Sequence, residues 1–303
     1  MIESEILVTG GSGMVGRELS QLLPGAQYPS SQALNLLSEA SITDYFARNK
    51  VSCVVHLAAH VGSLHDNIEN RVAYFDRNVV MNTLLTRIAA TRGVRKFLGV
   101  LSTCIYPDIV PRYPITEDQL HEGCPHADLL SYAYAKRAHA VQLDAYRESR
   151  GLEYSYVIPS NMFGVIREGH EGRGHFVNDL IRKIIHAKRC KTGEIELFGD
   201  GTPLRQFMLA RDFASVILEL IAAERHLPNM NVAPPYNLTI NEMAELGVKL
   251  SGGGIDIKYN DAKPNGQYRK DVDTAIFNAF LPDFTFTPFR EALQSVLEFY
   301  ESQ

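Results

Sequence analysis

Short apolar runs alternate with longer amphipathic segments through the first half of the chain. Strands are predicted over residues 5–8, 51–57, 97–101 and 154–158, and helices between them over residues 16–23, 80–91 and 132–150. Alternation of this kind is typical of βαβ units, in which consecutive strands run parallel. The pattern therefore predicts the α/β class, with a doubly wound parallel sheet covered by helices on both faces.

The chain changes in character after residue 163. Residues 164–174, rich in glycine, histidine and charge, predict a loop, and residues 176–187 predict a helix. Residues 211–224 again predict a helix that is apolar on one face. We therefore expect a larger domain over residues 1–163, which the chain rejoins at about 200–225, and a smaller α/β lobe from residues 164–199 and 226–303.

Composition excludes several classes of partner. The apolar fraction of 45% and the charged fraction of 21% are ordinary for a globular protein, and no apolar run is long enough to cross a bilayer. The net charge is −5 and there is no block of lysine or arginine, so neither a nucleic acid nor a membrane is expected as a partner.

The cysteines and the start of the chain indicate a cytoplasmic protein. A predicted strand begins within the first five residues, which leaves no room for a signal peptide. The four cysteines are widely separated and form no CxxC pair: Cys53, Cys104, Cys124 and Cys190. We expect no disulfide and no metal site from them.

A glycine-rich turn follows the first predicted strand. Residues 6–16 read ILVTGGSGMVG and lead into a predicted helix. A tight turn, the close approach of backbone to a pyrophosphate and close helix–strand packing each require a residue without a side chain. The sequence therefore predicts a Rossmann domain that binds a dinucleotide. The predicted contacts in this loop are Gly10, Ser12, Gly13, Met14, Val15 and Gly16.

The end of the second strand indicates which dinucleotide is bound. In NAD sites this strand commonly ends in an acidic residue that binds the ribose 2′-hydroxyl. The corresponding residues 28–32 read YPSSQ and contain neither a carboxylate nor an arginine. Absence of the acid leaves room for a 2′-phosphate, for which Ser30 and Ser31 are candidate donors. NADP is therefore favoured over NAD.

A serine, a tyrosine and a lysine follow in an order that suits carbonyl reduction. Ser102 stands at the end of an apolar strand, and Tyr132 and Lys136 are four residues apart on a predicted helix. That spacing puts both side chains on one helix face, where the ammonium, together with the positive nicotinamide ring of the cofactor, is expected to lower the pKa of the phenol. Tyr132 then serves as the general acid for a carbonyl oxygen that Ser102 also holds.

The glycine loop, followed along the chain by this serine, tyrosine and lysine, resembles the pattern of the extended short-chain dehydrogenase/reductase superfamily. The resemblance implies an oxidoreductase that acts on a nucleotide sugar. The alternative is a regulatory protein that senses NADP without turnover, but the presence of all three catalytic residues argues against it.

Cys104 and His175 indicate chemistry beyond reduction. Related dehydratases carry an Asp-Glu pair after the Ser-Thr, whereas this chain has Cys104 and Ile105. A C4 ketone acidifies the protons at C3 and C5, which a thiolate can remove. His175 is the candidate acid that returns each proton, because histidine titrates near neutral pH.

Several longer stretches resemble the GDP-L-fucose synthase family. They are STCIYP at 102–107, SYAYAKR at 131–137, IPSNMFG at 158–164, GTPLRQF at 201–207 and KPNGQYRK at 263–270. The resemblance implies that GDP-4-keto-6-deoxy-D-mannose is epimerised at C3 and C5 and reduced at C4 by NADPH, giving GDP-L-fucose. It also implies a homodimer, formed through helices that include the one after Tyr132.

The same resemblance implies the roles of individual residues. Ser102, Tyr132 and Lys136 match the reductive set, and Cys104 and His175 match the base and acid of epimerisation. Further cofactor contacts are implied for Asn35, Leu36, Leu57, Ala58, Ala59, Leu101, Asn161, Met162 and Gly164, together with Tyr132, Lys136 and His175. Substrate contacts are implied for Ser102, Thr103, Cys104, Asn161, Lys183, Phe198, Arg205 and Asn265.

The chain departs from the family's usual pattern near the expected substrate site. Asn265 replaces an aspartate, Phe198 replaces a tryptophan, and residues 165–170 read VIREGH. These positions bear on the base and the sugar and leave the class of chemistry unchanged. The alternatives are therefore epimerase/reductases of UDP-linked 6-deoxyhexoses or of GDP-linked heptoses.

Overall fold

Five parallel strands form the centre of the larger lobe. The computed structural model of the chain describes residues 2–166, 176–263, 265 and 267–303. In spatial order the strands are β1 (Ile6–Thr9), β2 (Cys53–His56), β3 (Lys96–Val100), β4 (Glu153–Pro159) and β9 (Met230–Val232). All four pairings are parallel. This confirms the predicted parallel sheet.

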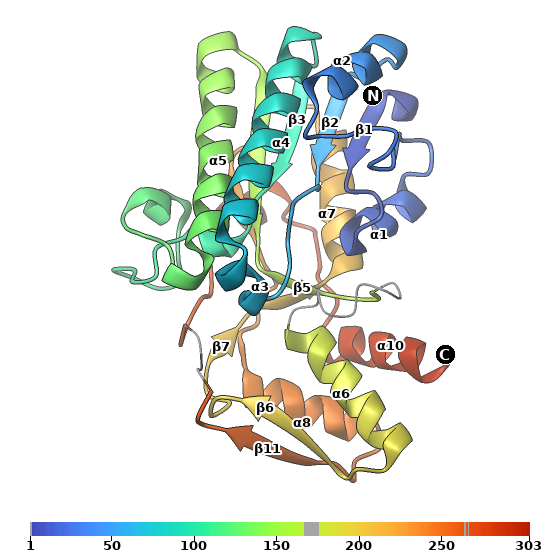
Figure 1. Cartoon of the computed structure of the whole chain (residues 1–303), viewed down its shortest axis with the longest axis vertical. Coiled ribbons are helices and arrows are strands. Elements are labelled where there is room, and N and C mark those ends of the chain that lie inside the picture. Colours follow the sequence, from blue (N-terminus) through green and yellow to red (C-terminus); the bar gives the residue numbers. More distant parts are fainter. Residues whose placement is uncertain (1, 167–175, 264, 266) are drawn as a thin grey trace.

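Helices cover both faces of this sheet (Figure 1). On one face lie α1 (Met14–Leu22) and α7 (Ala210–Ala222), and on the other lie α2 (Glu39–Arg48), α4 (Arg71–Thr91) and α5 (Leu130–Arg150). The sequence dictates this because side chains alternate between the faces of a strand. Ile6 and Val8 pack in the cluster that contains Phe213 of α7, whereas Leu7 packs in the cluster that contains Leu85 of α4.

The expected second strand is reduced to a single bridge. Of the residues between α1 and α2, only Gln27 pairs with β1, opposite Leu7, through two backbone hydrogen bonds of 2.8 and 2.9 Å. Pro29 follows two residues later, and a proline has no N–H to donate to a ladder. The segment therefore leaves the edge of the sheet immediately after this contact.

The smaller lobe is built on two further parallel strands, β6 (Glu194–Phe198) and β11 (Asp256–Asn260). They pack with α6 (Phe176–Cys190), α8 (Ile240–Leu250) and α10 (Phe289–Glu301), and Figure 1 shows β6 and β11 at the end of the molecule away from the central sheet. Two short pairs join this lobe to the larger one. They are β5 (Asn161–Phe163) with β8 (Phe207–Leu209), and β7 (Leu204–Arg205) with β10 (Leu238–Thr239).

Two segments assigned from sequence to the smaller lobe lie with the larger one. Strand β9 is the edge strand of the central sheet, and Phe277, Phe280 and Phe286 pack in the same apolar cluster as α7. The remaining short helices are α3 (Leu64–Glu69), α9 (Ala275–Phe280) and four 3₁₀ turns, Glu3–Glu5, Thr103–Ile105, Glu117–His121 and Ala127–Leu129. Within the described part of the chain, no helix combines the length and the apolar character that crossing a bilayer requires.

Candidate active site

The glycine loop has the geometry of a pyrophosphate cradle. Gly10 has a φ of +78°, and a Cβ there would lie 2.7 Å from the backbone nitrogen of Ala58. A Cβ on Gly16 would collide with the backbone oxygen of Gly10. Gly13 caps α1, whose first backbone N–H groups point at the loop and suit an anion. The residues present therefore fit a dinucleotide.

The other predicted cofactor contacts surround this loop at the carboxyl ends of the strands. Leu57, Ala58 and Ala59 directly follow β2, and Leu101 directly follows β3. A Cβ on Gly164, which follows β5, would lie 3.4 Å from the sulfur of Met14. The segment Asn161–Phe163 therefore ends beside the glycine loop. Asn35 and Leu36 belong to the segment that follows Gln27, and Leu36 packs against the cluster that contains Leu34 and Ile42.

Ser102 and Cys104 form a tight turn at the end of β3. The hydroxyl of Ser102 caps the 3₁₀ turn Thr103–Ile105 by accepting a hydrogen bond from the Cys104 backbone N–H at 3.4 Å. The Cys104 thiol donates to the same hydroxyl at 3.2 Å. Cys104 is 8% exposed and Thr103 is 2% exposed. The structure thus holds the thiol and the serine hydroxyl side by side.

Tyr132 and Lys136 approach this turn from the first turns of α5. Lys136 is 2% exposed and donates from Nζ to the backbone oxygen of Val100 at 2.9 Å. Its Nζ lies 5.9 Å from the centroid of the Tyr132 ring. Burial lowers the pKa of Lys136 from 10.5 to about 8, against an opposing effect of the nearby Cys104. The ammonium is therefore charged at neutral pH and close to losing its proton above it.

The protein's own groups raise the pKa of Tyr132, whereas the expected lowering also relies on the nicotinamide ring of a bound cofactor. Burial raises the pKa of Tyr132 well above its ordinary value, and Cys104 and Tyr74 raise it further. The low dielectric around the phenol penalises its anion. The phenol is therefore fully protonated at neutral pH, which is the state that a proton donor needs.

Lys270 joins this group from the smaller lobe, and sequence reasoning did not single it out. Burial lowers the pKa of its ammonium; Cys104 and Asp108 oppose that shift, and Arg205 adds to it. Lys270 therefore lies within electrostatic reach of both Cys104 and Arg205. Burial also lowers the pKa of Arg205, whose Nη1 donates to the backbone oxygen of Leu204 at 2.8 Å.

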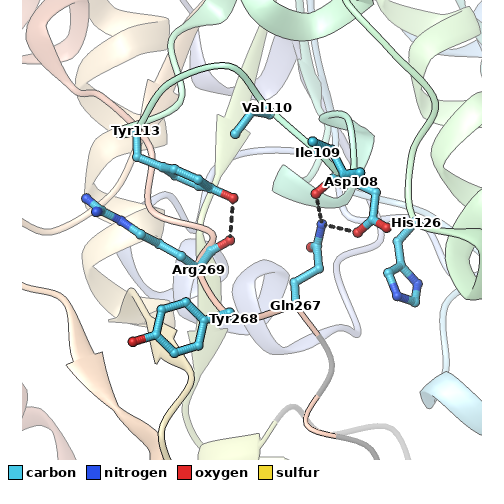
Figure 2. Close-up of a pocket in the computed structure, with 8 residues that line it drawn as sticks. All are labelled: Asp108, Ile109, Val110, Tyr113, His126, Gln267, Tyr268 and Arg269. Atoms are coloured by element: carbon cyan, nitrogen blue, oxygen red, sulfur yellow. Dashed lines mark hydrogen bonds between the residues drawn. The ribbon is translucent and has the colours of Figure 1, made fainter.

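A pocket of about 440 Å³ lies between the chain that follows Cys104 and the segment from Gln267 to Arg269 (Figure 2). Gln267 donates from Nε2 to the Asp108 carboxylate at 2.7 Å and to the Asp108 backbone oxygen at 3.3 Å. Tyr113 donates to the backbone oxygen of Arg269 at 3.2 Å. These contacts tie the two lobes together next to the catalytic turn. The lining residues are Asp108, Ile109, Val110, Tyr113, His126, Gln267, Tyr268 and Arg269.

The remaining predicted substrate residues gather around Phe198 on the smaller lobe. The Phe198 side chain is 58% exposed, and Lys183 and Lys263 lie 5.4 and 5.7 Å from its ring centroid. Lys183 also pairs with Asp179 at 3.0 Å. Asn265 accepts a hydrogen bond from the backbone N–H of Asp200 at 2.8 Å. The group offers an aromatic surface and cations, which suit a nucleotide.

His175 lies outside the described residues, so the structure does not place the proposed acid. Among the residues that are described, no three His, Cys, Asp or Glu side chains are grouped so that they could hold a metal ion, and all four cysteines are free. The structure therefore brings together Ser102, Cys104, Tyr132 and Lys136 as one group, with Lys270 and Arg205 beside them.

Comparison with known proteins identifies the family of the chain. The sequence profile of the NAD dependent epimerase/dehydratase family matches residues 6–233. The chain is 32% identical to the probable GDP-L-fucose synthase of Drosophila melanogaster, over 98% of this chain and 97% of that protein. It is 33% identical to the GDP-L-colitose synthase of Yersinia pseudotuberculosis, over 91% of each.

Among solved structures, a GDP-L-fucose synthetase from Naegleria fowleri bound to NADP superposes with a TM-score of 0.88 at 29% identity. The match covers 98% of this chain and 94% of that one. The family profile spans most of the chain, and the curated relatives match it over nearly its whole length. The chain therefore belongs to the NAD dependent epimerase/dehydratase family, in which its relatives include GDP-L-fucose synthases.

Proposed function

We propose that this chain is an NADPH-dependent 3,5-epimerase and 4-reductase of a nucleotide-linked 4-keto-6-deoxy sugar. The substrate is GDP-4-keto-6-deoxy-D-mannose and the product is GDP-L-fucose. The observation that carries the proposal is the group at the end of β3. There the Cys104 thiol contacts the Ser102 hydroxyl at 3.2 Å and lies within electrostatic reach of the Tyr132 phenol and the Lys136 ammonium. One ketone could contact a base and a proton donor at this place.

The reductive half uses Tyr132, Ser102 and Lys136. NADPH supplies the hydride to C4 when it is bound on the glycine loop. Tyr132 gives its proton to the C4 oxygen, and Ser102 donates a hydrogen bond to the same oxygen. Lys136 stabilises the phenolate that remains, since its Nζ is 5.9 Å from the ring centroid. The raised pKa of Tyr132 makes the transfer depend on this cation.

The epimerising half also depends on the C4 oxygen of the substrate. Removal of a proton at C3 or C5 places negative charge on the C4 oxygen, which Ser102 and Tyr132 can stabilise by hydrogen bonds. Cys104 is the proposed base, and His175 is proposed to return the proton from the other face. Lys270 adds positive charge near the Cys104 thiol. Both steps thus share one oxyanion site.

The substrate's nucleotide is proposed to bind along the smaller lobe. Arg205 and Lys270 suit the diphosphate, and the exposed ring of Phe198 with Lys183 suits the base. A second candidate substrate is the GDP-linked keto-sugar that leads to colitose, because the GDP-L-colitose synthase of Yersinia pseudotuberculosis is as similar as the fucose synthases. The ratio of kcat/KM for the two sugars decides between them.

The direct test is incubation with GDP-4-keto-6-deoxy-D-mannose and NADPH in deuterated water. We expect NADPH absorbance to fall and deuterium to appear in the product at both C3 and C5. Loss of absorbance without label would reduce the proposal to a plain ketoreductase. Binding of NADPH with neither reaction would favour the cofactor-sensing alternative.

The pH dependence of reduction is expected to follow Lys136. Its pKa is lowered to about 8, so the ammonium is present below that pH and is lost as the pH rises through it. Tyr132 stays protonated over this range, because its own pKa is raised. We expect kcat for reduction to decline above about pH 8. In the Lys136→Met variant the remaining activity should show no such decline, and persistence of the decline would assign it to another group.

A homodimer is proposed through the outer faces of α4 and α5. Apolar side chains are exposed there, with Val72 at 73%, Phe75 at 41% and Val141 at 53%. Exposed apolar patches on packed helices commonly mark interfaces. Sedimentation velocity should show a dimer for the wild type and a monomer for the Val72→Asp/Phe75→Asp variant. The Ile109→Asp variant, changed at an exposed apolar residue away from these helices, should remain dimeric.

The proposed location is the cytoplasm. All four cysteines are free, including the exposed Cys124 and Cys190. Free thiols persist in a reducing compartment. Fractionation of the source cells with detection of the chain would test this.

A further inference from the structure

The adenosine end of the dinucleotide site is formed by two uncharged segments. Residues 10–16 and 27–38 contain no aspartate, glutamate, lysine, arginine or histidine. They lie against each other, since a Cβ on Gly11 would be 2.9 Å from the ring of Tyr28. Ser30 and Ser31, which follow directly, are exposed. This is where the ribose of a dinucleotide lies when its pyrophosphate rests on the first helix.

Charged side chains that border these segments contact other parts of the protein and not residues 28–32. Arg17 of α1 donates from Nη2 to the backbone oxygen of Val165 at 2.5 Å. Glu39 at the start of α2 pairs with Arg87 of α4 at 2.8 Å. Glu3 lies beside Gly25, ahead of β1 and at the opposite end of the strand from the loop. None of these charged groups is engaged with residues 28–32.

Selection between the two dinucleotides normally uses charge. A carboxylate that accepts a hydrogen bond from the ribose 2′-hydroxyl favours NAD, and an arginine favours the 2′-phosphate of NADP. We propose that this chain, which has neither group in residues 10–16 or 27–38, binds NADH and NADPH with affinities that differ by less than about tenfold. A serine hydroxyl can donate to either a 2′-hydroxyl or a 2′-phosphate, and its hydrogen bonds are weaker than those of a guanidinium.

The inference rests on one part of the proposed function, the binding of a nicotinamide dinucleotide on the glycine loop. It is tested by equilibrium titration of the wild-type protein with NADH and with NADPH, followed by the fluorescence of the reduced nicotinamide. The expected ratio of dissociation constants lies within about tenfold, which is roughly the effect of one neutral hydrogen bond. A ratio beyond tenfold in either direction overturns the inference.

Two substitutions of Ser31 test whether this residue lies beside the ribose 2′ position. Ser31→Arg should tighten NADPH binding relative to NADH by about 10- to 100-fold, the range expected for hydrogen bonds to a charged group. Ser31→Asp should shift the ratio toward NADH. Ser302→Arg, which adds the same charge at the far C-terminal end, should leave the ratio unchanged. Equal ratios for wild type and both Ser31 variants would overturn the placement of the ribose.

Salt provides a readout that does not depend on activity. Without a cation at the 2′ position, the wild-type ratio should stay constant as ionic strength rises. In the Ser31→Arg variant the added preference for NADPH should weaken, because salt screens an exposed charge pair. A strongly salt-dependent ratio in the wild type would reveal a cation at the site and overturn the inference.

The outcomes separate this inference from the proposed sugar chemistry. A balanced binding ratio without any turnover of the keto-sugar would support the inference and contradict the proposed function. Turnover that is strongly selective for NADPH would do the reverse. Failure of both dinucleotides to bind would contradict both.

Discussion

Tyr132→Phe is expected to lower kcat for reduction by about 10³-fold, within the range that general acid catalysis contributes. The change removes only the hydroxyl, which is the proposed source of the proton for the C4 oxygen. The ring and its position 5.9 Å from the Lys136 Nζ remain. NADPH binding should therefore change little. Stopped-flow absorbance with an already epimerised 4-keto sugar measures the reductive step directly.

Tyr134 offers a matched control on the same helix. It stands two residues further on, it is 39% exposed, and its hydroxyl contacts the Cys124 thiol at 3.6 Å. The Tyr134→Phe variant should reduce the sugar at nearly the wild-type rate. If both variants lost activity equally, the assignment of the proton donor to Tyr132 would be wrong.

Cys104→Ser is expected to separate the two halves of the reaction. A serine hydroxyl is a far weaker base than a thiolate, so exchange at C3 and C5 should fall by about 10³-fold. Reduction of an already epimerised sugar should be largely retained, because Tyr132 and Lys136 are unchanged. Mass spectrometry of the product formed in deuterated water reads the first effect, and NADPH absorbance reads the second.

The control for this variant is Cys124→Ser, which changes an exposed cysteine outside the catalytic turn. It should leave both exchange and reduction intact. Equal losses of exchange and reduction in Cys104→Ser would instead mean that the thiol supports the turn through its 3.2 Å contact with Ser102.

The sequence was sufficient to predict the sheet and the meeting of Ser102, Cys104 and Tyr132 at one of its edges, because both follow from local patterns. Apolar runs separated by helices predict parallel strands, whose carboxyl ends all meet at one edge. A serine after β3 and a tyrosine in the first turn of α5 must then lie at the same edge. Cys104 is brought to them by chain connectivity alone, since it is two residues from Ser102.

The sequence did not predict the full length of α4, for a reason seen in its buried face. The helix was expected from residue 80, but it begins at Arg71. Asn78 and Asn82 occupy fully buried positions, where Asn78 accepts from the backbone N–H of His60 and donates to the backbone oxygen of Tyr74. Buried asparagines interrupt the apolar periodicity from which a helix is recognised.

Lys270 could not be linked to the catalytic turn from sequence either. It stands more than 160 residues after Cys104, and no spacing rule joins the two. The link is tertiary and depends on contacts such as that of Gln267 with Asp108 at 2.7 Å.

The segment around Gln27 shows the reverse case. The fold pattern predicted a strand there, but the local effect of Pro29 reduces that strand to a single bridge.

The pairing of β5 with β8 has a mechanical consequence. β5 carries the chain out of the central sheet and β8 carries it back into α7, and the two run parallel with Met162 opposite Met208. A rotation of one lobe against the other must bend both connections together at a common hinge. Asn161 pairs with Phe207, two residues beyond Arg205, so a displacement of Arg205 would be passed through this pairing to the chain that leaves β4.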